Sequence, residues 1–122
     1  KLDIEIVDIL RDKSGLEFKR DSEAEIKISK GKLTVKEFFP MNLLQKLSIM
    51  KEDVKDWKEL ADSIMIDFNF DGSVFKPQVV DVPGKNEIVK GTYDIPRESG
   101  KKIRIKITDL LSESFEETID NG

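Results

Sequence analysis

Residues 56–75 read DWKELADSIMIDFNFDGSVF, and this stretch decides the fold class. Its first part spaces apolar residues as a short helix does, with Trp57 and Leu60 on one side. From Ser63 the apolar period changes to two, which is typical of a strand. The residues expected on its buried face are Ile64, Ile66, Phe68 and Phe70. Asp71-Gly72 then predicts a type I′ turn that reverses the chain.

The same two-residue period recurs on both sides of this stretch. It is found in residues 2–10, 24–39, 89–95, 103–107 and 115–119. Lys30-Gly31 supplies the turn of a hairpin within residues 24–39. Each predicted strand has one polar face, which is typical of antiparallel sheets. We therefore expect a mainly β protein, an antiparallel immunoglobulin-like β-sandwich of about seven strands.

Residues 41–61 interrupt the strands with a short helical insert. Its first helix has the apolar face Leu43, Leu44, Leu47 and Met50. Asn42 is the expected N-cap of this helix, and Asp56 that of the second. Both helices are too short to be stable alone, so we expect them to lie on a sheet. The ring of Trp57 is expected to pin the second helix there.

The length of 122 residues predicts a single domain that buries roughly two thirds of the surface of its unfolded chain. With 21 basic and 25 acidic residues, the formal net charge is −4. This balance argues against nucleic-acid binding by the domain as a whole, because counterion release needs clustered Lys and Arg. No apolar run approaches the ~20 residues of a membrane span. Without a signal peptide, we expect a cytoplasmic location and no membrane partner.

The sequence contains no His and no Cys, which excludes Ser-His-Asp catalysis, cysteine nucleophiles and His/Cys metal sites. Gly100-Lys101 fails as a phosphate-binding loop, because Ile95 and Lys102 stand where Gly and Ser or Thr are required. The opening of a calcium loop is matched by Asp67, Asn69, Asp71 and Gly72. Gln78 occupies its twelfth position, where a bidentate carboxylate is required. We expect no catalytic, cofactor-binding or metal-binding residue.

The candidate contact surface is basic. Lys102, Arg104 and Lys106 share one face of a predicted strand. If Lys27, Lys32 or Lys36 lies on a neighbouring strand, a basic patch that touches phosphate or DNA would form, with Lys32 and Lys36 as its candidate residues there. The alternative is that these side chains only keep the solvent face of the sheet soluble. No aromatic residue is interleaved with them in the sequence, so stacking on single-stranded bases is not predicted.

Several segments resemble a known family. They are Asp56-Trp57-Lys58, SIMID at residues 63–67, Tyr93 and KIRIKITD at residues 102–109. Over roughly residues 24–119, this pattern resembles the C-terminal region of prokaryotic site-specific DNA modification methylases of the adenine-specific type. The Ile-Thr-Asp ending is also similar to PKD-type immunoglobulin-like modules. The catalytic marks of the methylases, a Phe-x-Gly-x-Gly loop and an Asp-Pro-Pro-Tyr tetrapeptide, are not in the sequence.

The resemblance implies a non-catalytic accessory domain, with S-adenosylmethionine bound and methyl transfer performed in another part of a parent methylase. We expect residues 1–122, which begin with Lys1 and not Met, to be a C-terminal fragment of that protein. Its partners would be the rest of the methylase and DNA. The alternative is an extracellular immunoglobulin- or PKD-like module that binds protein or polysaccharide through exposed aromatic residues. Trp57 and Tyr93 are the candidates for that role, and both are expected to be buried.

Overall fold

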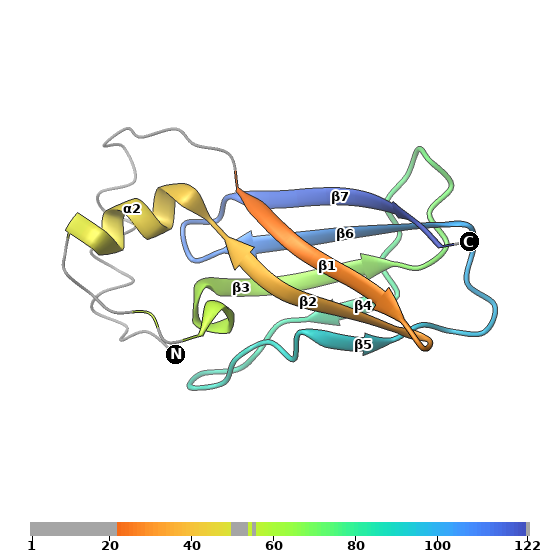
Figure 1. Ribbon diagram of the computed structural model, residues 1–122, viewed down its shortest axis with the longest axis horizontal. Coiled ribbons are helices and arrows are strands. Elements are labelled where there is room, and N and C mark those ends of the chain that lie inside the picture. Colours follow the sequence, from red (N-terminus) through yellow and green to blue (C-terminus); the bar gives the residue numbers. More distant parts are fainter. Residues whose placement is uncertain (1–21, 50–53, 55, 122) are drawn as a thin grey trace.

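Two antiparallel sheets pack face to face in the computed structural model, which describes residues 22–49, 54 and 56–121 (Figure 1). The first sheet has the order β1 (Glu23–Ser29), β2 (Lys32–Phe39) and β5 (Thr92–Asp94). The second has the order β4 (Val79–Asp81), β3 (Ala61–Asp67), β6 (Lys102–Asp109) and β7 (Ser114–Asp120). The expected mainly β sandwich is confirmed. The strand predicted in residues 2–10 lies outside the described residues.

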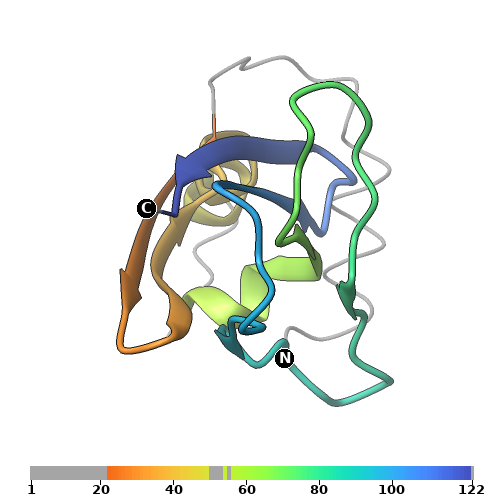
Figure 2. The same ribbon diagram turned by 90° about the vertical axis from the view of Figure 1, so that its right-hand side faces the viewer.

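The order of the strands is that of an immunoglobulin-like sandwich. Lettered along the chain as A, B, C, C′, E, F and G, the strands form the sheets A-B-E and C′-C-F-G. Every neighbouring pair is antiparallel. Figure 2, which looks along the strands, shows β1 and β2 on one side and the β3–β4 loop on the other.

The core lies between the sheets, because alternate residues of the facing strands are apolar. Its fully buried members include Leu33, Phe38, Ile64, Ile66, Ile103, Ile105 and Ile107. Burying one such side chain stabilises the fold by about 1.5–3 kcal/mol. The three isoleucines of β6 are each 0% exposed, so this strand forms the centre of the four-stranded sheet.

The hairpin of β1 and β2 turns at Lys30-Gly31, as the sequence predicts. Lys30 has a φ of 53° and Gly31 a φ of 73°, so both central residues are left-handed, as a type I′ turn requires. This turn matches the right-handed twist of the two strands, which explains why two residues are enough to connect them.

The β3 strand ends at Asp67 and not at Phe70, and residues 68–78 form a long loop. Asp67 Oδ1 accepts a hydrogen bond from the N–H of Asn69 at 2.9 Å, which bends the chain out of the strand. Gly72 has a φ of 90° but Asp71 does not have a positive φ. The predicted type I′ turn at Asp71-Gly72 is therefore wrong.

The helical insert lies at one end of the sandwich (Figure 1). It contains α2 (Met41–Ile49) and the 3-10 helix η1 (Trp57–Leu60), whereas Ala61 already belongs to β3. Asn42 is not an N-cap, because the Pro40 carbonyl accepts the Leu44 N–H at 2.9 Å and the helix begins before Asn42. The Asn42 side chain instead donates to the Glu113 carboxylate at 3.0 and 3.1 Å.

Trp57 holds η1 against the first sheet, as expected. Its ring meets that of Phe38 edge-on, with the centroids 6.4 Å apart. Asp56 caps η1 by accepting the Lys58 N–H at 3.1 Å. Gly91 leaves room for the indole, since a Cβ there would lie 3.1 Å from a ring carbon of Trp57.

Candidate functional site

The five basic residues that the sequence indicates as candidates for contact with phosphate or DNA fall on two opposite surfaces of the sandwich. Lys32 and Lys36 alternate with buried apolar residues of β2, so they face outward from the three-stranded sheet. Lys102, Arg104 and Lys106 alternate with the buried isoleucines of β6, so they face outward from the four-stranded sheet. The core lies between the two groups. They do not form one basic patch, because the neighbours of β6 are β3 and β7.

Acidic residues accompany the cations on both surfaces. Lys32 Nζ lies 3.9 Å from Asp94, and Arg104 Nε lies 3.5 Å from Glu116. In the β6–β7 register, Lys106 is opposite Glu116 and Lys102 is opposite Asp120. Exposed ion pairs of this kind are worth about 0–1 kcal/mol each. Their main effect here is that the β6 surface carries both signs of charge.

The loop 68–78 brings aromatic rings beside the basic residues of β6. The Phe70 N–H donates to the Lys102 carbonyl at 3.1 Å, which fixes the loop along β6. The guanidinium of Arg104 then lies over the Phe70 ring, 5.4 Å from its centroid, in a cation–π contact. Phe70 therefore leaves the core face on which the sequence pattern placed it. The clustered Asp and Asn residues before it were the available signal, because they favour loops.

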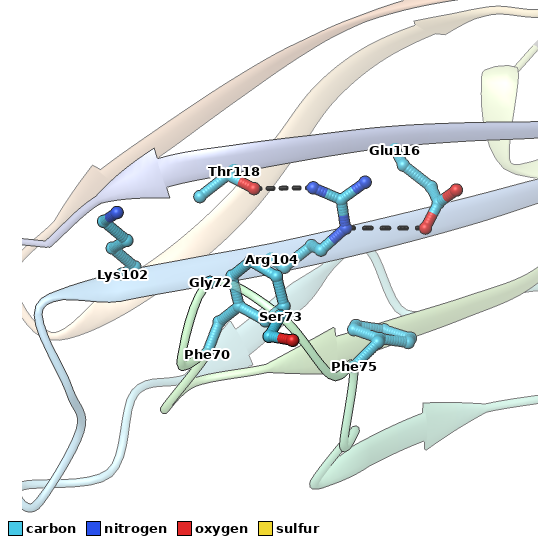
Figure 3. Close-up of a pocket in the computed structure, with 8 residues that line it drawn as sticks. All are labelled: Phe70, Gly72, Ser73, Phe75, Lys102, Arg104, Glu116 and Thr118. Carbon is cyan, nitrogen blue, oxygen red and sulfur yellow. Dashed lines mark hydrogen bonds and ion pairs between the residues drawn. The ribbon is translucent and has the colours of Figure 1, made fainter.

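An open pocket of about 580 Å³ lies between this loop and the outer surface of β6 and β7 (Figure 3). It is lined by Phe70, Gly72, Ser73, Phe75, Lys102, Arg104, Glu116 and Thr118. Its volume falls within the range of about 300–1,000 Å³ that is usual for small-molecule sites. The wall combines two phenyl rings, two cations, a carboxylate and hydroxyl groups. The sequence alone does not reveal this pocket, because its lining residues are up to 48 positions apart, from Phe70 to Thr118.

Three interactions hold the Arg104 side chain in this wall. Besides Phe70 and Glu116, Thr118 Oγ1 accepts a hydrogen bond from Arg104 Nη1 at 2.7 Å. Figure 3 shows the guanidinium between Thr118 and Glu116 of β7, with Lys102 standing apart from it, beyond Thr118. Arg104 is thus a fixed part of the pocket, whereas the exposed ammonium of Lys102 has no ion-pair partner among the described residues.

The residues that resemble a calcium loop hold the pocket loop in shape. Both carboxylate oxygens of Asp67 accept backbone N–H groups, from Asn69 at 2.9 Å and Lys76 at 2.8 Å. Gln78 Oε1 accepts the Phe68 N–H at 2.6 Å. Hydrogen bonds from the N–H groups of Val74 and Ser73 lower the pKa of Asp71. These side chains account for the loop conformation, which closes one side of the pocket.

Tyr93 also has a structural role. It is 7% exposed, and its hydroxyl donates to Asp81 Oδ2 at 2.5 Å and accepts the Gly91 N–H at 3.2 Å. Burial, followed by the hydrogen bond to Asp81, raises the pKa of Tyr93 above its ordinary value. This contact ties β5 to β4 across the two sheets.

A buried carboxylate, Asp109, lies at the end of β6. Its Oδ1 accepts the N–H groups of Leu111 at 2.8 Å and Glu113 at 3.1 Å, which shapes the β6–β7 turn. Its Oδ2 is buried and has no hydrogen-bond partner. Burial raises the pKa of Asp109 to about 6. Within the described part of the chain, no group of three or more acidic side chains could hold a metal ion.

No helix among the described residues is long and apolar enough to cross a membrane. Comparisons with protein-family models, with curated proteins and with solved structures found no match for this chain.

Proposed function

We propose that this chain is a non-catalytic accessory domain of a DNA modification methyltransferase, which docks on the rest of the enzyme or positions its DNA. The support from the sequence is the resemblance of its fold-building segments to the C-terminal region of adenine-specific methylases. In this proposal, S-adenosylmethionine is bound elsewhere in the parent protein.

The observation that carries the proposal is the outer surface of the four-stranded sheet. Val80 and Val82, at and beside the edge strand β4, are 56% and 60% exposed. The half-buried Met65 of β3 lies in register between Val80 and Lys106. An apolar strip therefore adjoins the mixed-charge strip of β6 and β7. Exposed apolar surface rimmed by polar residues favours a contact with another protein surface.

The charge distribution supports one of the two roles over the other. A surface that binds duplex DNA needs an excess of cations along the path of the DNA phosphate backbone. The β6 surface instead interleaves its cations with Glu116 and Asp120, and Lys32 and Lys36 face the other way. Docking on the methylase is therefore the primary role that we propose for the apolar strip, which we call the docking strip (Met65, Val80 and Val82).

The first test is the full gene around the codon of Lys1. We expect it to encode a Phe-x-Gly-x-Gly loop and an Asp-Pro-Pro-Tyr-like tetrapeptide. A gene without any methylase motif would contradict the proposal. If the motifs are present, the parent lacking this domain should transfer methyl groups from S-adenosylmethionine to DNA more slowly than the whole protein, and adding the domain in trans should restore the rate.

The second test uses matched variants of the domain in that complementation assay. Val80→Glu places a charge in the docking strip and should abolish the restored activity. Ile49→Glu is the control, because Ile49 is 62% exposed on α2 and outside the strip. Equal restoration by both variants would show that the strip is not the docking surface.

The extracellular alternative receives no support from Tyr93 and Trp57, the two aromatic residues expected to carry it. Tyr93 is buried and hydrogen-bonded to Asp81, and Trp57 packs edge-on against Phe38. Neither offers a ring on an exposed sheet face for stacking against a sugar.

A further inference from the structure

The pocket beside Arg104 has chemistry that the docking strip does not use. Its phenyl rings offer flat apolar surface, and its polar groups carry both signs of charge. A simple anion would meet the Glu116 carboxylate, and a simple cation would meet Arg104 and Lys102. A ligand that is complementary to the residues lining this pocket combines a flat ring, hydrogen-bond donors and acceptors, and a negative group near Lys102.

A nucleotide combines these properties. Phe70 is already covered on one face by the Arg104 guanidinium, whereas Phe75 has no aromatic or cation partner among the described residues. Phe75 is therefore the ring free to stack on a base. Lys102 lies on β6 at the same pocket, and its exposed ammonium is free to contact a phosphate. Figure 3 shows that the oxygen atoms of Glu116 and Thr118 point to the Arg104 guanidinium, so these groups hold the pocket wall in shape and leave Phe75 and Lys102 for the ligand.

We propose that this pocket binds a short stretch of single-stranded nucleic acid, with one unpaired base stacked on Phe75 and a phosphate further along the strand on Lys102, at the opposite end of the pocket (Figure 3). The base must be unpaired, because the ring surface lies in a depression between the loop and the sheet, where a base inside a duplex does not reach. The loop needs little ordering for this, since Asp67 and Gln78 already brace it.

This inference deepens the DNA-positioning form of the proposed function and rests on it for its biological role. The binding itself depends only on the pocket. One nucleotide contact by an acidic domain gives weak binding, with a dissociation constant on the order of 10⁻⁴ M at moderate salt. Such a contact becomes effective when a second domain holds the same strand nearby, because tethering raises the effective concentration.

The test is fluorescence anisotropy of the whole 122-residue chain with labelled decamers at 50 mM salt. The probes are oligothymidylate, oligouridylate, an abasic decamer of equal charge, and a duplex. We expect both base-bearing single strands to bind, and the abasic strand and the duplex to bind at least fivefold more weakly. Equal binding of the abasic strand would overturn the proposal, because the base would contribute nothing. A preference for the duplex would overturn it as well.

Three variants locate the contact. Phe75→Leu removes the ring but keeps apolar bulk, and it should weaken decamer binding by roughly 5- to 160-fold, the range of base–aromatic stacking. Lys102→Gln should lower the slope of log K against log salt by about 0.7, the value for one phosphate of a single strand. Lys36→Gln is the matched control, because it removes one exposed cation from the opposite sheet. Unchanged binding by Phe75→Leu, or equal slopes for the two lysine variants, would overturn the proposal.

The outcomes separate this inference from the proposed function. If no decamer binds at 1 mM protein (roughly ten times the expected dissociation constant) but the domain restores its parent methylase, the inference fails and the proposed function stands. If the gene encodes no methylase motif but Phe75→Leu still weakens decamer binding, the proposed function fails and the pocket assignment stands.

Discussion

Replacing Asp109 by Asn should change how stability depends on pH. Burial raises the pKa of this carboxyl from 3.8 to about 6 in the folded protein. Each pKa unit corresponds to about 1.4 kcal/mol, so the ionised form is disfavoured by about 3 kcal/mol in the folded state. Asp109 is 0% exposed, so solvent screens little of this effect.

The sign follows from the raised pKa. Below about pH 3.8 the carboxyl is protonated in both the folded and the unfolded protein, and the favourable contribution of its protonated form is fully present. As pH rises through about 6, the folded protein must ionise a buried group next to Glu113 and Asp62, and that contribution is lost. The free energy of unfolding should therefore fall across this window through Asp109.

Asp109→Asn keeps the Oδ1 acceptor for the N–H groups of Leu111 and Glu113 but removes the ionisation. Its new amide donor enters the place of the unpartnered Oδ2 and costs about 1–3 kcal/mol at every pH if it finds no acceptor. The informative quantity is the change in this variant's effect between pH 4 and pH 7.5. Between pH 4 and pH 7.5 we expect the stability of the variant relative to wild type to rise by about 2 kcal/mol, because at pH 4 a part of the effect of about 3 kcal/mol is already lost.

Urea unfolding followed by the fluorescence of Trp57, the single tryptophan, measures both proteins at the two pH values. Asp94→Asn is the control, because it makes the same substitution at an exposed position of the other sheet. A difference between Asp109→Asn and wild type that is the same at pH 4 and pH 7.5 would refute the reasoning.

Three further substitutions, each measured by urea unfolding, test the contacts that hold the fold together. Gly91→Ala should lower the free energy of unfolding by about 1–3 kcal/mol, because φ is 82° and the new Cβ would lie 3.1 Å from the Trp57 ring; no loss would show that the indole can move. Asp67→Ala leaves the N–H groups of Asn69 and Lys76 without their acceptor, and it should lower the free energy of unfolding by about 2 kcal/mol while the m-value stays unchanged. Ile105→Ala should cost about 2–5 kcal/mol, whereas Ile49→Ala, at a 62% exposed position, should cost under about 0.5 kcal/mol; similar losses would contradict the burial pattern.

The sandwich could be predicted because its strands have a local signature. In β6 the isoleucines alternate with Lys and Arg. When one face of a strand is buried, an apolar period of two residues determines which side chains point to the core. The Lys30-Gly31 turn was predictable because it joins two strands directly. These features depend on neighbouring residues, so the sequence alone contains them.

The pocket could not be predicted, because it depends on contacts between distant residues. Asp67 bends the chain through its own side chain, and this overrides the strand period that would have buried Phe70. Pairing of the loop with β6 then places Phe70 beside Arg104, 34 positions away. Spacing in the sequence showed lysines without aromatics, whereas the folded surface contains both.

The isoleucines of β6 set the frame of the pocket as well as the core. A slip of β6 by one residue would exchange its two faces and bury Lys102, Arg104 and Lys106, which the core does not permit. The spacing of the pocket's charged groups is therefore fixed by apolar residues that a ligand never touches. Substitutions in the loop 68–78 can then alter which ligand fits while the strand-borne half of the pocket keeps its position. Such a division between an invariant frame and an adjustable loop makes this surface a practical scaffold for engineered recognition.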